Sequence, residues 1–364
     1  MVDVQGECDE RFGEVRDALE ASLDKDDVGA SAAVYLDGEP VVDIWGGYAD
    51  EARTRPWERD TITNVWSTTK TMVALCALIL ADRGVIDLDA PVARYWPEFG
   101  AEGKENVLVR HVLSHTAGLP VWDEPLPTER LYDWPLVTGL LAAQTPRSEP
   151  GAVGAYHAVT QGFLIGEVVR RVTGRSIGEF FAGEVAGPLG ADFHLRLPAE
   201  HDHRVAPMIA PRTMSPEMVA QGPGNPPITP ETVNTEAWRR AEIPSGSGFG
   251  NARSIGAVQS VLASGGQVRG VRLLSAAGCE RVLAEQFAGV DELLGAQMRY
   301  GMGYGLQGRT ALWGGRGGSL VLVDFDTRMT VAYAMNQMLD EGMLGDDRAM
   351  SIVFAAYGGL QNAG

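Results

Sequence analysis

A continuous apolar run from Met72 to Leu80 constrains the fold of this chain more than any other feature. The run is apolar on nearly every side, as a helix buried in a protein core is. The residues before it, Thr61–Trp66, are rich in β-branched side chains and predict extended chain. Between the two segments lies Ser67-Thr68-Thr69-Lys70. We therefore expect Ser67 at the N-terminus of a core helix.

Ser67 and Lys70 have the spacing that serine acyl-transfer enzymes use, S-x-x-K. Residues three apart share a helix face, so the lysine amine is expected against the serine hydroxyl. A serine hydroxyl is a weak nucleophile and needs such a base beside it. The positive end of the helix dipole disfavours an ammonium there, and burial lowers the pKa of a lysine. Both effects favour the neutral amine that a general base requires.

The same spacing occurs a second time, at Ser22-Leu23-Asp24-Lys25. Acidic residues surround this copy, and an acidic, solvated setting keeps a lysine protonated and useless as a base. We therefore interpret Ser22–Lys25 as the end of a surface helix.

The bulk composition excludes several classes of function. A net charge of −18 disfavours nucleic acid and anionic membranes as partners. No apolar segment reaches the roughly 18 residues that a membrane span needs. The first residues have neither the basic start nor the apolar stretch of a signal peptide, so a cytoplasmic location is expected. Three scattered cysteines do not predict a disulfide framework. No cofactor is indicated, and the oligomeric state is left open.

The order of elements predicts an α+β fold. An initial helix (Glu10–Leu23) and a hairpin (30–36 and 40–45) precede the core helix, and the middle of the chain reads as helices between long Pro- and Gly-rich loops. The clearest middle helix is 161–173, and Pro207–Pro230 reads as a surface or lid loop. A helix at 252–263, a hairpin at 318–325 and 329–335, and a last helix at 346–357 follow.

This pattern indicates an antiparallel sheet built from both ends of the chain and covered by helices. We expect residues 1–85 and 240–364 to form that sheet domain. Residues 86–239 are expected to form a mostly helical inserted domain, with the active site between the two.

Two further segments carry residues suited to the chemistry of Ser67. Tyr156 lies in a loop just ahead of a predicted helix, where the helix dipole and Lys70 are expected to lower its pKa. Trp313-Gly314-Gly315-Arg316-Gly317-Gly318-Ser319 enters a predicted strand, and glycines there let the backbone approach a ligand closely. Taken singly, Tyr156 is better explained as an ordinary half-buried aromatic, and the segment Trp313–Ser319 as a flexible turn, than as catalytic elements.

Taken together and in order, the segments resemble the serine β-lactamase and penicillin-binding superfamily, and more narrowly its esterase branch, the family VIII carboxylesterases. The resemblance covers nearly the whole chain. Its residues are Ser67-Thr68-Thr69-Lys70, His111-Val112-Leu113-Ser114-His115-Thr116-Ala117-Gly118-Leu119, Pro150-Gly151, Tyr156 with the Gly162–Gly174 helix, and Trp313-Gly314-Gly315.

The resemblance implies a β-lactamase/DD-peptidase-like fold and a role for each motif. Ser67 would be the acylated nucleophile, and Lys70 and Tyr156 would share proton transfer. The backbone N–H groups of Ser67 and Arg316 would form the oxyanion hole. Residues expected near the substrate are Trp66, His157, Phe249, Trp313, Gly314 and Gly315, and no metal is expected.

Two departures from the β-lactamase and peptidase pattern favour an ester substrate. Those enzymes generally carry a lysine-led K-T-G on the strand where this chain has Trp313-Gly314-Gly315. They usually carry Asn two residues after the tyrosine, where this chain has Ala158. The groups that suit a β-lactam carboxylate and side-chain amide are thus both missing, although Arg316 could restore some charge. We expect an esterase for short-chain or bulky hydrophobic carboxylic esters.

Several alternatives stay open from the sequence alone. A β-lactamase or D-alanyl peptidase-like amidase, an acyltransferase, and a binder that is acylated without turnover would use the same residues. An α/β-hydrolase is disfavoured because no G-x-S-x-G elbow is present. His201-Asp202-His203 lacks the further ligands of a metallohydrolase.

Overall fold

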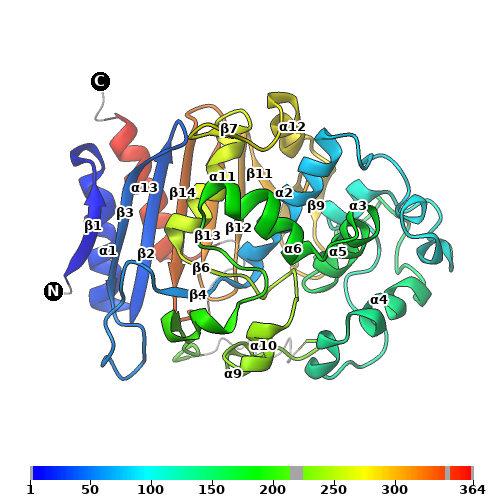
Figure 1. Cartoon of the computed structure of the whole chain (residues 1–364), viewed down its shortest axis with the longest axis horizontal. Coiled ribbons are helices and arrows are strands. Elements are labelled where there is room, and N and C mark those ends of the chain that lie inside the picture. Colours follow the sequence, from blue (N-terminus) through cyan, green and yellow to red (C-terminus); the bar gives the residue numbers. More distant parts are fainter. Residues whose placement is uncertain (1–2, 214–223, 341–344, 362–364) are drawn as a thin grey trace.

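The computed structural model of the chain describes residues 3–213, 224–340 and 345–361. Its centre is an antiparallel sheet whose strands run in the order β1-β3-β2-β14-β13-β12-β11-β10-β9 (Figure 1). The strands are β1 (Val4–Cys8), β2 (Gly29–Leu36), β3 (Glu39–Gly47), β9 (Phe287–Val290), β10 (Gln297–Tyr300), β11 (Gly305–Gln307), β12 (Thr310–Gly314), β13 (Leu320–Asp324) and β14 (Met329–Met335).

The two ends of the chain meet in the middle of this sheet. Strand β14 pairs with β2 over seven residues, from Met329 opposite Leu36 to Met335 opposite Ala30. Strand β14 also forms the expected hairpin with β13. The α+β prediction of an antiparallel sheet built from both ends of the chain is therefore confirmed.

Helices cover both faces of the sheet. Neighbouring residues of a strand point to opposite faces, and β14 shows which helix lies on each. Tyr333 donates its hydroxyl proton to Asp27, just after α1 (Gly13–Lys25), and packs beside Arg348 of α13 (Asp347–Gln361). Ala332, on the other face, lies against Gly256 of α11 (Ala252–Ala263). Helices α1 and α13 thus share one face and α11 covers the other.

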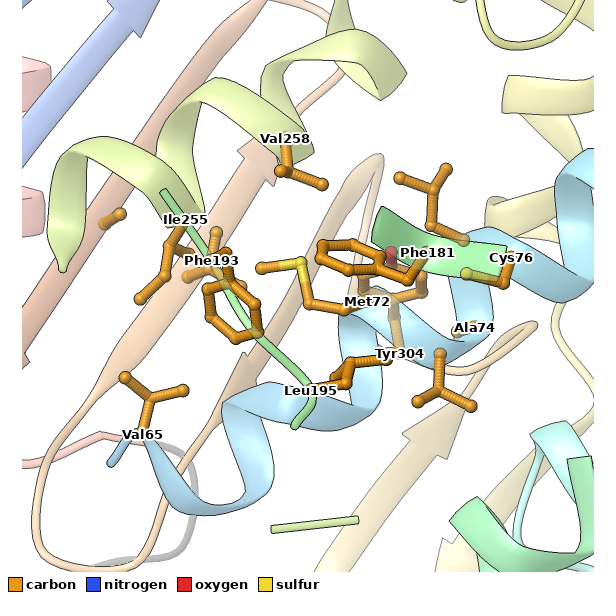
Figure 2. Packing of buried hydrophobic residues seen from close by; sticks show 14 of the residues in the cluster. Val65, Met72, Ala74, Cys76, Phe181, Phe193, Leu195, Ile255, Val258 and Tyr304 are labelled. Carbon is orange, nitrogen blue, oxygen red and sulfur yellow. The ribbon is translucent and has the colours of Figure 1, made fainter. Parts of the chain in front are cut away.

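Helix α2 (Thr69–Asp82) lies in the core, as its apolar run predicts; every residue from Thr69 to Leu80 is buried. Figure 2 shows Met72, Ala74 and Cys76 of α2 among side chains from α11 and from α6 (Ile177–Phe181). Packing on several sides therefore holds the N-terminus of α2 in place. This packing also fixes the position of Ser67, which lies just ahead of the helix.

The middle of the chain forms helices beside the sheet (Figure 1). They include α3 (Val109–Leu113), α4 (Trp134–Ala143), α5 (Thr160–Thr173), α7 (Gly187–Leu189), α9 (Pro230–Val233) and α10 (Glu236–Arg240), and α12 (Ala276–Glu280) follows later. Short strands complete the fold, β4 (Ile62–Asn64) between β5 (Val205–Ala206) and β6 (Phe249–Gly250), and the pair β7 (Gln267–Val268) and β8 (Val271–Arg272). The division into domains 1–85 with 240–364 and 86–239 stays a prediction.

Some elements differ from the sequence prediction. The extended segment expected over Thr61–Trp66 is a strand only from Ile62 to Asn64, because the chain then turns with Trp66 at a φ of 46°. Strands β1, β9, β10 and β11 were not predicted, because strands of three to five residues carry too little apolar alternation to be recognised. Within the expected lid loop, residues 214–223 lie outside the described residues. Over the described ranges, no helix combines the length and the apolar character that crossing a membrane requires.

Two adjacent glycines of α13 test how closely this helix packs on the N-terminal segment. A Cβ on Gly359 would lie 2.4 Å from the ring of Phe12, whereas one on Gly358 would meet only the carboxylate of Glu14, at 2.8 Å. Alanine gains about 1 kcal/mol of helix propensity over glycine, but overpacking a core costs about 1–3 kcal/mol. We expect Gly358→Ala to keep or raise the thermal midpoint and Gly359→Ala to lower it. Equal midpoints for the two variants would contradict this packing.

Candidate active site

Ser67 lies in a tight turn between β4 and α2, within the 3-10 segment Trp66–Thr68. The turn begins at Asn64, whose side-chain oxygen accepts the N–H of Trp66 at 3.0 Å. Trp66 then adopts a left-handed φ, which is uncommon for a bulky side chain and is typical of functional sites. Ser67 is half-buried, while its neighbours on both sides are buried. Ser67 is therefore the one partly exposed residue in an otherwise buried turn.

The amine of Lys70 lies against this hydroxyl. The distance from Lys70 Nζ to Ser67 Oγ is 3.0 Å. Nζ also donates to two backbone carbonyls, that of Ala158 at 2.7 Å and that of Ser245 at 3.0 Å. A neutral amine has two N–H groups and one lone pair, so two carbonyl acceptors leave the lone pair for the hydroxyl proton of Ser67.

Burial decides the protonation state of Lys70. Its side chain is buried, no carboxylate within the described ranges pairs with it, and burial alone lowers its pKa well below the usual lysine value. Taking an ammonium out of water without a counter-charge is expensive, so the group becomes neutral instead. Lys70 therefore has the protonation state of a general base.

Tyr156 contacts the same oxygen from the other side. Its hydroxyl donates to Ser67 Oγ at 2.7 Å, and Lys70 Nζ lies 5.0 Å from the centre of its ring. The loop ahead of α5 carries it, as the sequence indicates. The expected lowering of its pKa is wrong, because burial raises the pKa of this phenol and the hydrogen bond with Ser67 offsets only part of that effect. Tyr156 is thus a protonated donor rather than a phenolate.

The end of strand β12 packs directly against the turn that carries Ser67. A Cβ on Gly315 would lie 2.3 Å from the carbonyl oxygen of Val65 and 2.3 Å from Ser319 Oγ, so only glycine fits there. The hydroxyl of Ser319 donates to that carbonyl at 2.9 Å and lies 3.0 Å from Thr68 Oγ1. These contacts fix residues 313–319, the glycine-rich loop, relative to Ser67.

The N–H groups of Ser67 and Arg316 are both unused within the described residues. Gly315 donates its N–H to the carbonyl of Ser319 at 2.8 Å, but neither Ser67 nor Arg316 makes a backbone hydrogen bond through its own N–H. Two unpaired N–H groups on segments locked together are suited to hold an oxyanion.

The guanidinium of Arg316 has a structural role in this arrangement. It donates to the carbonyl of Ile228 at 3.0 Å and lies 5.6 Å from the centre of the Trp66 ring. The group is half-buried, and burial lowers its pKa. Arg316 thus clamps the indole beside the nucleophile onto the segment around Ile228.

His157 does not lie at the mouth of the site. Its ring is buried; Nδ1 donates to the carbonyl of Ala155 at 2.6 Å, and Nε2 accepts the N–H of Leu119 at 3.2 Å. Burial lowers its pKa to about 4, so the imidazole is neutral and both nitrogens are committed to the backbone. His157 is therefore not placed to contact a substrate, contrary to the sequence prediction.

Phe249 and Trp313 are also buried rather than open to a ligand. Phe249 lies in β6 within the main core. Trp313 packs against the rings of His115 and Tyr156, with centroid distances of 5.4 and 5.5 Å. The indole thus supports Tyr156 from behind, which explains a tryptophan at the place where a substrate contact was expected. Trp66, Gly314 and Gly315 do lie beside the nucleophile turn, but all three are buried.

The second S-x-x-K copy forms no site. Lys25 is 81% exposed and pairs with Asp26 at 3.1 Å, while Ser22 donates to Asp27. Helix α1 ends at Lys25, as expected for a surface helix. At the histidine pair 201 and 203, Asp202 pairs with Arg239 and Arg240. The described residues contain no group of three or more His, Cys, Asp or Glu side chains that could hold a metal ion.

Sequence reasoning missed the groups that hold Lys70 and the glycine-rich loop. The carbonyls of Ala158 and Ser245 are backbone atoms, for which residue type gives no signal. Ser319 carried a weak signal, since it ends the glycine-rich segment and a buried hydroxyl needs a partner.

The comparison with protein families agrees with this geometry. The family described as Beta-lactamase matches residues 15–353. The chain belongs to the beta-lactamase family. Its similarity to carboxylesterases of this fold shows that the chain is a serine hydrolase.

Similar proteins in this family include enzymes with esterase names. Esterase/beta-lactamase LipL of Mycobacterium tuberculosis is 34% identical over 87% of this chain and 79% of its own. A family VIII carboxylesterase structure is 43% identical, with a TM-score of 0.93 over 98% of this chain and all of that chain. A penicillin-binding protein homolog from Caulobacter crescentus has a TM-score of 0.92 and 34% identity over 98% of this chain and all of its own.

The contact between Gly315 and the nucleophile turn gives a direct test of this beta-lactamase-family site. A methyl group at Gly315 must push the loop away from Val65, and a displacement of about 1 Å in a catalytic group can cost on the order of a hundredfold in rate. We expect Gly315→Ala to lower kcat/KM on p-nitrophenyl esters at least about tenfold. Gly139→Ala is the control, because nothing lies within 4 Å of a Cβ there. Equal rates for the two variants would show that the contact is unimportant.

Proposed function

We propose that this protein is a serine ester hydrolase that acts through an acyl-enzyme at Ser67. The observation that carries the proposal is the 3.0 Å contact between Ser67 Oγ and an amine that burial keeps neutral. A nucleophile and its base within hydrogen-bond reach, with the base oriented by further groups, is the arrangement that covalent catalysis requires.

Acylation follows from the hydrogen bonds at Ser67. Oγ bonds to the ester carbonyl carbon while its proton passes to Lys70 Nζ, and the carbonyl oxygen becomes an oxyanion. The N–H groups of Ser67 and Arg316 are proposed to hold that oxyanion; their lack of backbone partners supports this role. One such donor is worth about 10²–10³ in kcat.

Tyr156 is proposed to protonate the leaving alcohol. Its hydroxyl donates to Ser67 Oγ, the oxygen next to which the leaving group departs. When the tetrahedral intermediate collapses, the bond to the alcohol oxygen breaks, that oxygen takes the Tyr156 proton, and Lys70 replaces it. Water then attacks the acyl carbon, and Lys70 and Tyr156 together remove a proton from that water. The bond between Ser67 Oγ and the acyl carbon breaks, Ser67 regains its hydroxyl proton, and the acid is released.

An ester is the proposed substrate for two reasons. Ala158 contributes a carbonyl to Lys70 but no side-chain amide to hold a peptide or β-lactam. Trp313 stands where a cation would attract a carboxylate, and the guanidinium of Arg316 is directed to Ile228 and Trp66. The esterase names of similar proteins agree with this choice. Short-chain or bulky hydrophobic acyl groups are the proposed class.

We further propose a cytoplasmic location and small-molecule substrates. Cys8, Cys76 and Cys279 are free thiols, which fits a reducing compartment. A net charge of −18 argues against nucleic acid as a partner.

A p-nitrophenyl ester series and a chromogenic cephalosporin, each given to the same set of variants, test the proposal. We expect the wild type to hydrolyse short-chain esters with a burst of p-nitrophenol, and to turn over the cephalosporin far more slowly. Ser67→Ala and Lys70→Met are each expected to lower ester kcat by at least about 10³. Ser67 and Lys70 are proposed to act as one catalytic unit, so the loss of either residue costs about as much as the loss of both.

Lys25→Met is the matched control, since it makes the same substitution in the second S-x-x-K copy, on an exposed side chain. It is expected to keep wild-type kcat. Ester hydrolysis that survives in Ser67→Ala would disprove the nucleophile, whereas efficient cephalosporin turnover with poor ester cleavage would overturn only the substrate class.

A further inference from the structure

A buried ion network packs against the glycine-rich loop at Gly317 and Gly318. Arg348 of α13 is at its centre, with its side chain 2% exposed between the fully buried carboxylates of Asp27 and Asp346, each 2.6 Å away. The cost of burying such charges often exceeds their mutual attraction, so a buried ion pair is weak evidence of a purely stabilising role. The remaining contacts of Arg348 are therefore informative.

Arg348 also donates to the backbone of the glycine-rich loop. Its Nη2 lies 2.6 Å from the carbonyl oxygen of Gly317, and its Nη1 lies 2.9 Å from that of Gln337. The N–H of Leu339 donates to the same Gly317 oxygen at 3.2 Å. The network packs tightly on the loop, because a Cβ on Gly318 would lie 2.5 Å from Arg348 Nη2.

The Gly317 carbonyl belongs to the same peptide unit as the N–H of Gly318. That N–H donates to the carbonyl of Gly315 at 3.1 Å and closes the turn. The Gly315 carbonyl, in turn, shares a peptide unit with the N–H of Arg316. A trans peptide directs its C=O and N–H to opposite sides. The N–H of Gly318 holds the Gly315 carbonyl, so the N–H of Arg316 points to the other side of that peptide unit.

We propose that Arg348 is a positioning residue for the oxyanion hole, acting through these two peptide units in series. The guanidinium anchors and polarises the 317–318 peptide, which orients and polarises the 315–316 peptide, whose N–H faces the developing oxyanion. Hydrogen-bonded amides in a chain strengthen one another by roughly 10–30% per bond. Asp27 and Asp346 hold the guanidinium in an orientation that reaches Gly317.

This inference rests on the proposed function, since it requires an oxyanion beside Ser67. The probe is a fluorophosphonate, which reports the nucleophile and the oxyanion hole without knowledge of the natural ester. Ser67 Oγ bonds to phosphorus, the P–F bond breaks, fluoride leaves, and the Ser67 proton passes to Lys70. The rate constant of labelling and the labelled residue are measured by mass spectrometry, beside kcat and KM on a p-nitrophenyl ester.

Arg348→Met is expected to slow labelling and lower kcat at least about tenfold, a part of the 10²–10³ that a whole donor is worth, with KM changed less than about twofold. Arg348→Lys, which keeps the charge and a donor, is expected to recover part of the rate. Arg204→Met is the matched control, because Arg204 also forms an ion pair at 2.6 Å with little exposure, to Asp192, and its guanidinium bonds Asp192 and the carbonyl of Asp60 rather than the loop. It is expected to lose thermal stability but keep its rates.

Removing Arg348 alone leaves two buried carboxylates unpaired, which costs about 3–5 kcal/mol and can prevent folding. The variant Arg348→Met/Asp27→Asn/Asp346→Asn leaves no unpaired charge and is measured in parallel, with the same expected loss of rate. Wild-type rates in Arg348→Met or in the triple variant, or a loss in Arg204→Met as large as in Arg348→Met, would overturn the proposal. A wild type that is not labelled at Ser67 would instead overturn the proposed function.

Discussion

The burial of one amine without a counter-charge is the constraint on which this site depends. Lys70 is enclosed by the core packing of α2, and its hydrogen-bonding needs are met by the carbonyls of Ala158 and Ser245. An added carboxylate would hold the lysine protonated and destroy the base. The hydrogen bonds of the Lys70 amine are therefore accepted by neutral carbonyl groups from two other segments. The two hydrogen bonds from Lys70 to these carbonyls also fix the segments around it.

The groups proposed to be catalytic come from segments far apart in the sequence, and close backbone contacts bring them together. Gly315 permits β12 to touch the turn at Val65, and Ser319 bonds that turn from the same strand connection. Behind them, Arg348 reaches the loop from the last helix. The antiparallel sheet built from both chain ends makes this possible, because it places β12, β14 and the N-terminal strands in one rigid layer. Chemistry at Ser67 is thus supported from both termini.

Much of this arrangement could be predicted from the sequence. The apolar run after Lys70 predicted a core helix, and the order of the motifs distinguished Ser67 from Ser22. The structure brings Ser67, Lys70 and Tyr156 together, and α11 and β14 have the bounds that their patterns indicated. The pKa direction of Tyr156 and the place of His157 were wrong, because both depend on burial by other segments. The carbonyls that bind Lys70 were not predicted because residue type gives no signal for a backbone atom, and strands β1, β9, β10 and β11 were missed because they are short.

The charge of Lys70 in the resting protein is the most direct measure of this account. The chain has only three lysines, Lys25, Lys70 and Lys104, so a protein with ¹³C-labelled lysine gives three ε-carbon signals, and Lys70→Arg identifies one of them. We expect the Lys70 signal to titrate well below the usual lysine range, as burial directs, and kcat/KM to rise with pH through the same midpoint because the neutral amine is the base. A Lys70 signal that stays protonated up to the usual lysine range would contradict the mechanism.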